Sequence, residues 1–300
     1  MPSPERAEPR ALALDLASLA VGSVIWGTTW RAIKLQLGTV PPLESVVYRF
    51  ALASALLFGW LLVSRRRIAL TPSQHMAALG QGAFGFCLQY ACVYVAEGTV
   101  SSGAMAVIFA ATAFVNLLLF RLFLGLRPAR LAWVGVLLGL AGVAAMSVSQ
   151  ITGGPGVRAG VLIALAGVLV SVVSNLFAAR GQAAGVAVVP GTAWAMGYGA
   201  AILALFVFAT GAPWRFELTA RYVGALGYLS VLGSVTAFVV FYSLARRRGY
   251  TFASYVAALT PPTAMVVSAL TESTRWGWPA FAGLGLVLGG QILLIRGGRT

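Results

Sequence analysis

Residues 104–146 read AMAVIFAATAFVNLLLFRLFL-GLRPAR-LAWVGVLLGLAGVAAM, which is two apolar runs joined by a short basic connection at 125–130. The runs extend over 100–124 and 131–148. Each is near the roughly 20 residues that an α-helix needs to cross the hydrocarbon core of a bilayer. The same design returns 148 positions later, at residues 252–294. This stretch therefore predicts a pair of membrane helices that occurs twice.

The offset of 148 positions also holds upstream of this stretch without a gap. A gapless repeat across a whole apolar chain is typical of transporters built from two related halves. We therefore predict one five-helix unit at residues 1–150 and a second at 151–300. The matching residues include Ser23 and Ser171, Pro42 and Pro190, Gly85 and Gly233, Tyr94 and Tyr242, Thr112 and Thr260, Arg127 and Arg275, and Gly142 and Gly290.

The composition excludes a soluble globular domain. Of the 300 residues, 59% are hydrophobic and 9% are charged, whereas soluble domains carry about 25% charged residues. The mean hydropathy is +0.89. A net charge of +14 would suggest nucleic-acid binding in a soluble protein. Here the arginines lie between apolar spans and no nucleic-acid motif is present, so we expect membrane lipid rather than nucleic acid as a partner.

Ten candidate spans follow one another with only short connections between them. Because a backbone inside lipid must satisfy its own hydrogen bonds, the spans are expected to be helices, which predicts an all-α integral membrane protein. The first is too long for a signal-peptide core and lacks a small-residue cleavage site, so we expect it to be a membrane helix. The spans cover roughly 12–37, 43–63, 75–96, 100–124, 131–148, 159–180, 191–209, 222–245, 251–271 and 277–295.

Basic connections alternate along the chain with connections that are poor in cations. Residues 65–67 and 246–248 are all arginine, whereas residues 39–44 include no lysine or arginine. By the positive-inside rule, the basic connections and both termini are expected in the cytoplasm. Five spans is an odd number, so the second half begins on the opposite side of the membrane. The sequence thus predicts ten transmembrane helices arranged as two inverted five-helix repeats around a central cavity.

The segment Ser23–Lys34 contains the pair Trp26-Gly27, and Tyr48-Arg49-Phe50 follows in the second span. These residues resemble the first two helices of the drug/metabolite transporter superfamily, whose EamA-type repeat opens with a Trp-Gly pair and has an arginine in its second helix. Spaced glycines in the fifth and tenth spans, Pro261-Pro262 in the ninth and Glu272 after it extend the resemblance over nearly the whole chain.

Within the superfamily, the chain is most similar to the bacterial YddG-type exporters of aromatic and other amino acids. The resemblance implies a secondary transporter of the inner membrane that exports amino acids or related small metabolites by alternating access. It also implies a cavity lined by the first, third, fourth, sixth, eighth and ninth helices, with the fifth and tenth at the periphery. A passive channel for small solutes and a multidrug exporter of the same superfamily are the alternatives.

Substrate sites of such transporters lie near the membrane midplane, at the interface of the repeats. Aromatic rings there can stack on apolar parts of a solute, and amides can orient its polar end. The alternative roles are interfacial anchoring for the tyrosines, packing for tryptophan, and hydrogen bonds between helices for the amides. The residues expected to contact a small-molecule substrate are Trp26, Gln89, Tyr90, Tyr94, Thr112, Ser174, Asn175, Tyr242 and Thr260.

Three cations, Arg31, Lys34 and Arg49, lie toward the predicted outer ends of their spans. We expect them to reach the membrane interface or to pair with Glu44 and Glu97, in preference to binding a carboxylate. In the ninth span, Pro261-Pro262 is expected to interrupt the helix, which would expose backbone groups to substrate or form a structural kink.

Enzymatic chemistry finds little support in the sequence. There is one histidine, His75, and the acidic residues are not clustered. Cys87 and Cys92 share one span but lie on different helix faces. We therefore predict no catalytic residue, cofactor or metal, and nothing implies an oligomer. No ionisable side chain is expected at mid-membrane, so we predict facilitated transport. A sodium site near Pro261 is the alternative.

Overall fold

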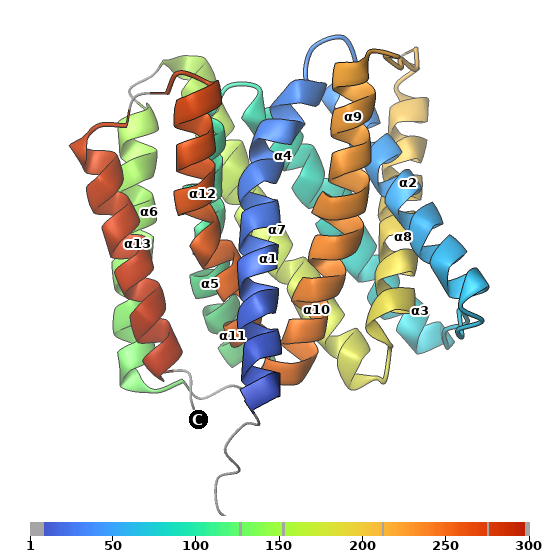
Figure 1. The fold of residues 1–300 in the computed structure, drawn as a ribbon, viewed down its shortest axis with the longest axis horizontal. Coiled ribbons are helices and arrows are strands. Elements are labelled where there is room, and N and C mark those ends of the chain that lie inside the picture. Colours follow the sequence, from blue (N-terminus) through green and yellow to red (C-terminus); the bar gives the residue numbers. More distant parts are fainter. Residues whose placement is uncertain (1–8, 126–127, 152–153, 212, 275, 298–300) are drawn as a thin grey trace, which may run out of the picture.

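The computed structural model describes residues 9–125, 128–151, 154–211, 213–274 and 276–297, and the regular elements in these ranges are helices (Figure 1). The π-helical segments η1 and η2 each lie within a longer helical span. The bounds are α1 Pro9–Gln36, α2 Pro42–Val63, α3 Pro72–Gln81, η1 Gly82–Gln89, α4 Tyr90–Glu97, α5 Ser102–Leu124, α6 Arg130–Ile151, α7 Pro155–Ala183, α8 Val188–Ala209, α9 Ala220–Tyr228, η2 Leu229–Thr236, α10 Ala237–Arg248, α11 Tyr250–Ala253, α12 Tyr255–Thr271 and α13 Trp278–Gly297.

Ten apolar helical segments match the predicted spans. Within the described residues, 7 are long and apolar enough to cross a membrane, and three shorter apolar helices complete the set. One span, Pro72–Glu97, consists of α3, η1 and α4, and another, Ala220–Arg248, consists of α9, η2 and α10. The prediction of an all-helical membrane protein is thus confirmed.

The two halves repeat each other in structural detail as well as in sequence. Each half has a π-helical segment near the middle of its third span, η1 at Gly82–Gln89 and η2 at Leu229–Thr236. Each of these spans also begins with a threonine cap, because Thr71 accepts a hydrogen bond from the Gln74 amide and Thr219 accepts one from the Tyr222 amide. In Figure 1, α3 leads upward into α4 whereas α9 leads downward into α10. The repeats are therefore inverted.

Pairs of corresponding helices hold the halves together. The pairs are α2 with α8, α5 with α12, and α6 with α13. The last pair lies at one edge of the molecule (Figure 1), which agrees with the peripheral position predicted for the fifth and tenth spans. Its glycines permit close contact, since a Cβ placed on Gly142 would lie 2.6 Å from the Gly283 carbonyl oxygen.

The ninth span differs from the prediction. Its helix α12 runs through Pro261 and Pro262, and the break lies earlier, at Ser254 between α11 and α12. Packing against both α1 and α5 restrains this helix. The hydroxyls of Ser23 and Thr260 also donate to the Val256 carbonyl, at 3.1 and 2.7 Å, just before the prolines. Packing against neighbouring helices is one reason that proline is tolerated within a membrane helix.

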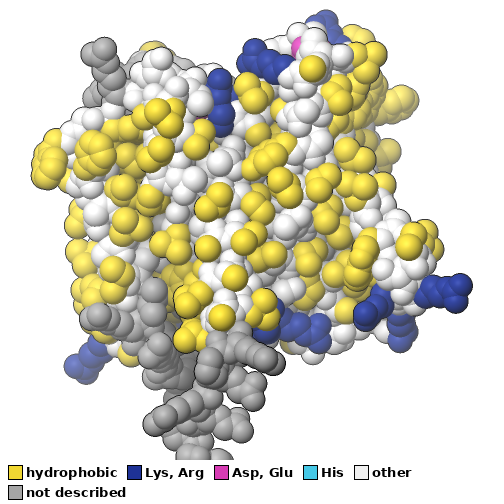
Figure 2. Space-filling model, viewed as in Figure 1, with side chains coloured by type: hydrophobic (Ala, Val, Ile, Leu, Met, Phe, Trp, Pro, Cys, Tyr) yellow, Lys and Arg dark blue, Asp and Glu magenta, His cyan; other side chains and the backbone are white. Residues whose placement is uncertain are grey.

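The surface agrees with a protein that is surrounded by lipid. Figure 2 shows apolar side chains across the middle of the visible face, with Lys and Arg at its upper and lower edges. Large apolar side chains such as Phe208 and Leu270 are 75% and 80% exposed. Four arginines used in the sequence predictions lie outside the described residues. They are the matched pair Arg127 and Arg275, and the terminal Arg6 and Arg299.

Candidate functional site

A central cavity of about 90 Å³ lies between the two halves. The lining comes from α1, η1 with α4, α5, α7, α10, and the segment from Ser254 into α12. These belong to the first, third, fourth, sixth, eighth and ninth spans, the six that were predicted. Among the described residues, the lining includes no Asp, Glu, Lys, Arg or His.

One wall of the cavity is aromatic. The ring of Trp26 on α1 lies 5.3 Å from the rings of both Phe238 and Phe241 on α10, measured between centroids. Phe86 from η1 packs edge-on against Phe238 at 5.0 Å. Phe238 also stacks on Tyr242 at 5.9 Å. Edge-on and stacked contacts between rings are favourable arrangements, so this wall offers an ordered apolar surface from both halves.

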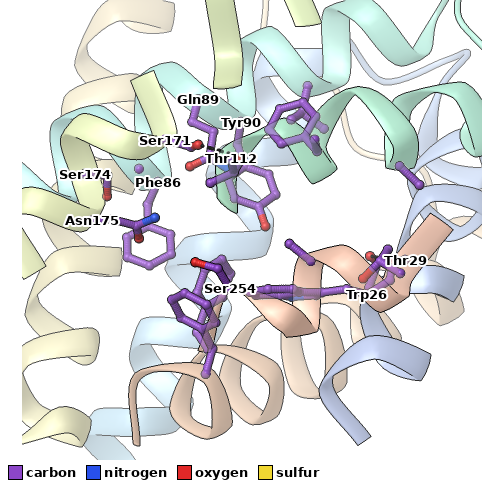
Figure 3. A pocket seen from close by; sticks show the side chains of 18 of the residues that line it. Trp26, Thr29, Phe86, Gln89, Tyr90, Thr112, Ser171, Ser174, Asn175 and Ser254 are labelled. Atoms are coloured by element: carbon purple, nitrogen blue, oxygen red, sulfur yellow. Dashed lines mark hydrogen bonds between the residues drawn. The ribbon is translucent and has the colours of Figure 1, made fainter. Parts of the chain in front are cut away.

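The opposite wall carries amides and hydroxyls. The Asn175 Nδ2 donates to Asn116 Oδ1 at 3.3 Å, and the Asn116 Nδ2 donates to Ser254 Oγ at 3.2 Å. Thr112 and Ser171 are within hydrogen-bond distance, at 3.3 Å. Figure 3 shows Thr112, Ser171 and Asn175 gathered on one side of the pocket, away from Trp26. The cavity thus combines aromatic rings, several of them packed around Trp26, with amides and hydroxyls that gather on the side away from Trp26, where Phe86 also lies.

The structure brings together eight of the nine residues predicted to contact substrate. All eight line the cavity, from both halves of the chain. Their contact with a substrate stays a prediction. They are Trp26, Gln89, Tyr90, Thr112, Ser174, Asn175, Tyr242 and Thr260.

Tyr94 is the exception, because it does not line the cavity. Its side chain is 0% exposed, and its hydroxyl donates to Gln36 Oε1 at 2.7 Å. Tyr94 and Tyr242 are both buried. Neither of them is therefore an anchor at the membrane interface, which was the alternative role considered for these tyrosines. Tyr94 instead joins α4 to the end of α1.

Several lining residues were missed by sequence reasoning, although helical spacing would have found them. Residues three or four positions apart share one helix face. Trp30 follows Trp26 by one turn, Phe238 precedes Tyr242 by one turn, and Ser171 precedes Ser174. The missed residues whose side chains carry rings or hydroxyls are Trp30, Phe86, Phe109, Ser171, Phe238, Phe241 and Ser254.

Arg49 contradicts the expectation that it reaches the interface or pairs with Glu44 or Glu97. It is 0% exposed. Its Nε donates to Ser234 Oγ at 2.8 Å, and its Nη2 donates to the Gly233 carbonyl at 3.3 Å. Because these acceptors belong to η2, 184 and 185 residues away in the chain, the fold draws the guanidinium inward.

The two glutamates have other partners. Glu44 Oε2 accepts from the backbone amide of Arg215 at 2.7 Å, and Glu97 Oε1 accepts from Ser102 Oγ at 2.6 Å.

Lys34 forms a cross-half ion pair with Glu272, at 3.4 Å. Burial favours the neutral form of Glu272, but hydrogen bonds from Ser102, the charge of Lys34 and the hydroxyl of Ser268 outweigh it and lower the pKa of this carboxyl. At the opposite end of α1, Asp15 accepts from Arg247 Nε at 3.1 Å and from Arg248 Nε at 2.5 Å. The first helix is therefore joined to the second half at both of its ends.

The comparisons with known proteins point to one family. The model of the EamA-like transporter family matches residues 16–148 and again residues 158–296. The "Uncharacterized inner membrane transporter YedA" of Escherichia coli strain K12 is 33% identical over 135 residues, which are 44% of this chain and 43% of that protein. "Protein PagO" of Salmonella typhimurium is 31% identical over 88 residues, 29% of each chain.

The matched regions thus span less than half the length of these curated relatives. A solved crystal structure has the same fold over almost its whole length. Its TM-score is 0.71 at 17% sequence identity, and the match covers 97% of this chain and 99% of the other. Within the described residues, no group of three or more His, Cys, Asp or Glu side chains is placed to hold a metal ion.

Proposed function

The chain belongs to the EamA-like transporter family, and on that premise we propose that it is a secondary transporter of amino acids or related small metabolites. It would export aromatic and other neutral amino acids across the bacterial inner membrane by alternating access. The observation that carries this proposal is the two-sided cavity. An aromatic wall from α1 and α10 faces a row of amides and hydroxyls from α5 and α7.

A solute with an apolar body and a polar end fits these two walls. The rings of Trp26 and Tyr242 would stack on the apolar body. Asn175 would orient the polar end, because its side-chain amide can both donate hydrogen bonds to a ligand and accept them. The other contacts proposed are Gln89, Tyr90, Thr112, Ser174 and Thr260.

The membrane and orientation of the protein are also part of the proposal. The relative YedA is named an inner membrane transporter, which supports the same location here. The arginine clusters at 65–67 and 246–248 support cytoplasmic termini by the positive-inside rule. The proposal also includes the division of the chain into two five-helix repeats, residues 1–150 and 151–300. A cysteine replacing the exposed Thr39 should react with an impermeant thiol reagent outside intact cells; reaction only after lysis would reverse the orientation.

The charge-free lining supports facilitated transport. A proton-coupled carrier needs an ionisable group that both sides of the membrane can reach. The described lining includes no Asp, Glu, Lys, Arg or His, so an imposed pH gradient without a solute gradient should give no accumulation in proteoliposomes. Accumulation under those conditions would contradict this part of the proposal.

Transport by the purified protein in liposomes tests the proposed function. Uptake of labelled phenylalanine should saturate and should accelerate when unlabelled phenylalanine is present inside. Replacing Trp26, Asn175 or Tyr242 with Ala should lower the rate about 5- to 30-fold, because each removes a contact worth on the order of 1–2 kcal/mol. The exposed Leu205→Ala provides a matched control outside the cavity.

Unsaturable flux without exchange would instead indicate a passive channel. Saturable transport of bulky apolar cations, with no effect of phenylalanine, would indicate a multidrug exporter of the same superfamily. Wild-type transport rates in all three cavity variants would show that the cavity is not the substrate site.

A further inference from the structure

Two buried carboxylates meet at the end of the molecule that is the outer one in the proposed orientation. Both accept a hydrogen bond from the same residue. Ser102 Oγ donates to Glu97 Oε1 at 2.6 Å, and the Ser102 backbone amide donates to Glu272 Oε2 at 3.3 Å. Glu97 is 1% exposed, and the side chain of Glu272 is 8% exposed. A carboxylate of each half therefore lies in one shared, enclosed place.

One cation serves both carboxylates. Lys34 Nζ lies 3.4 Å from Glu272 Oε2. Within the described part of the chain, Lys34 and Glu272 are the charged groups that interact with Glu97. If both carboxylates were ionised, one negative charge would stay uncompensated in an enclosed site. Burial and a neighbouring like charge both disfavour that state.

The other elements packed on α4 bring no further charge to this pair in the described residues. These elements are α2, α5, α7 and η1. On α2, Glu44 accepts from the Arg215 amide and Arg49 donates to η2. On α7, Arg158 is exposed near the start of the helix. The pair therefore depends on its own lysine and its own hydrogen-bond donors.

The two carboxylates differ in the donors that they receive. Glu272 Oε2 accepts from Lys34, from the Ser102 amide and from Ser268 Oγ, the last at 3.0 Å. Such donors stabilise the charged form of a carboxyl group. Glu97 accepts from Ser102 alone, and its Oε2 is buried without a partner. Glu97 is therefore the carboxyl group of this pair that a proton would occupy.

A metal ion is a poorer occupant than a proton. The ammonium group of Lys34 already lies against Glu272. Among the described residues, no three His, Cys, Asp or Glu side chains gather to hold a metal ion. A proton needs only the one oxygen that lacks a partner.

The cluster joins four of the six spans that line the cavity. Lys34 lies near the end of α1, and Glu97 ends α4. Ser102 begins α5, and Glu272 follows α12. Separation of the two halves at this end would break the contacts of Glu272 with Lys34 and Ser102. The protonation state of the cluster is thus placed to influence how firmly the halves are joined here.

We propose that Glu97 binds a proton in the described conformation and that this proton holds the outer ends of the two halves together. When the proton passes to water at the outer surface, two carboxylates face each other across one lysine, and their repulsion favours separation. The joined arrangement is therefore favoured at low outer pH and is lost as the outer pH rises. Because the proton exchanges with one side only, it changes the rate of opening and leaves the direction of transport to the solute gradient.

Distances between two spin labels on the full chain in nanodiscs test this inference. The labels are attached to cysteines that replace the exposed Thr99 and Thr271, with Cys87 and Cys92 changed to serine. These positions lie beside the two carboxylates, one in each half. The ratio of long to short distances should rise by up to about tenfold per pH unit within the range from about pH 5 to about pH 9.

Two variants make the measurement specific. Glu97→Gln, which resembles the protonated carboxyl group and cannot ionise, should keep the short distance at every pH. Glu217→Gln is the matched control. It removes a carboxylate in another connection predicted on the same side, one that accepts from Thr219 Oγ1, and it should leave the pH response unchanged.

Infrared difference spectroscopy provides a readout that a merely structural role would not change. The protein with Glu97 should show the carbonyl stretch of a protonated carboxyl group at neutral pH, and Glu97→Gln should lack it. A distance ratio that is independent of pH, or the absence of this band, would overturn the inference even if Glu97→Gln does not fold. A pH response or a band that survives in Glu97→Gln would overturn it as well. Neither measurement needs a substrate, so these results leave the proposed function standing.

Discussion

Asn116 and Asn175 illustrate what a buried amide requires within a membrane protein. Each is at least nine-tenths buried, and each finds its partner on another helix. An amide without a partner in an apolar medium would cost several kcal/mol. The two amides therefore link α5 with α7 and with Ser254, while they leave hydrogen-bonding capacity toward the cavity. Structural and ligand-binding roles coexist in the same side chains.

Tyr94 provides a residue-scale prediction that separates those roles. Because its hydroxyl bonds to the buried Gln36 and does not reach the cavity, Tyr94→Phe should lower stability by about 1–3 kcal/mol without changing the KM for transport. Thermal unfolding in detergent and liposome kinetics measure the two quantities. Tyr48→Phe is the control, since its hydroxyl bonds at an exposed site. A raised KM with unchanged stability would place Tyr94 in the substrate site, as the sequence suggested.

At the scale of elements, the two π-helical segments contribute directly to the cavity. Gly85, Phe86 and Gln89 of η1 line it, and η2 holds Arg49. A π-helical turn widens the helix and shifts the residues that follow to a different face, and such turns occur often at functional sites. Neither segment was predicted, because a hydrophobic pattern inside lipid carries too little contrast to reveal a local change in helical period.

The glycines of α6 and α13 allow an element-scale prediction with a matched control in the next residue. A Cβ on Gly290 would lie 2.5 Å from the Gly135 carbonyl oxygen, whereas a Cβ on Gly289 meets nothing within 4 Å. Gly290→Ala should therefore force the two helices apart and cost about 1–3 kcal/mol. Gly289→Ala should be neutral, or stabilising by up to about 1 kcal/mol through helix propensity. Thermal unfolding and folded yield in detergent measure both.

Equal stability of the two variants would show that α6 and α13 do not pack through these glycines. Transport by folded Gly290→Ala protein should retain its KM, because this helix pair contributes nothing to the described cavity lining.

At the scale of the whole molecule, lipid made much of the fold predictable. Span length, charge alternation and the offset of 148 follow from composition and spacing. The six lining helices were indicated by the family resemblance together with the positions of polar residues within the spans. The predictions that were wrong concern features that depend on contacts between residues far apart in the sequence. Arg49 turns inward because η2 lies 184 residues away, and α12 stays helical at Pro261 because α1 and α5 pack on it. Neither contact leaves a local pattern in the sequence.

The same reasoning explains the candidate site. Polar residues within apolar spans stand out, and eight of the nine that were predicted line the cavity. Aromatic residues such as Phe238 and Phe241 were missed, because aromatic side chains in a membrane protein are equally common on faces that contact lipid. Only the packing of α1 against α10 shows that Phe238 and Phe241 face the cavity and not the lipid.

The first helix connects the two halves at both ends, through Lys34 with Glu272 and through Asp15 with Arg247 and Arg248. Both ion pairs are formed in the described conformation.

Two-sided access to the cavity is the most direct test of this account. In a background with Cys87 and Cys92 replaced by serine, Thr112→Cys should be modified by an impermeant thiol reagent added to either face of oriented vesicles, and phenylalanine should slow both reactions. Ala110→Cys, on the same helix but 0% exposed and outside the cavity, should not react. Modification of Thr112→Cys from one face only, or modification that phenylalanine leaves unchanged, would contradict a central cavity that serves both sides of the membrane.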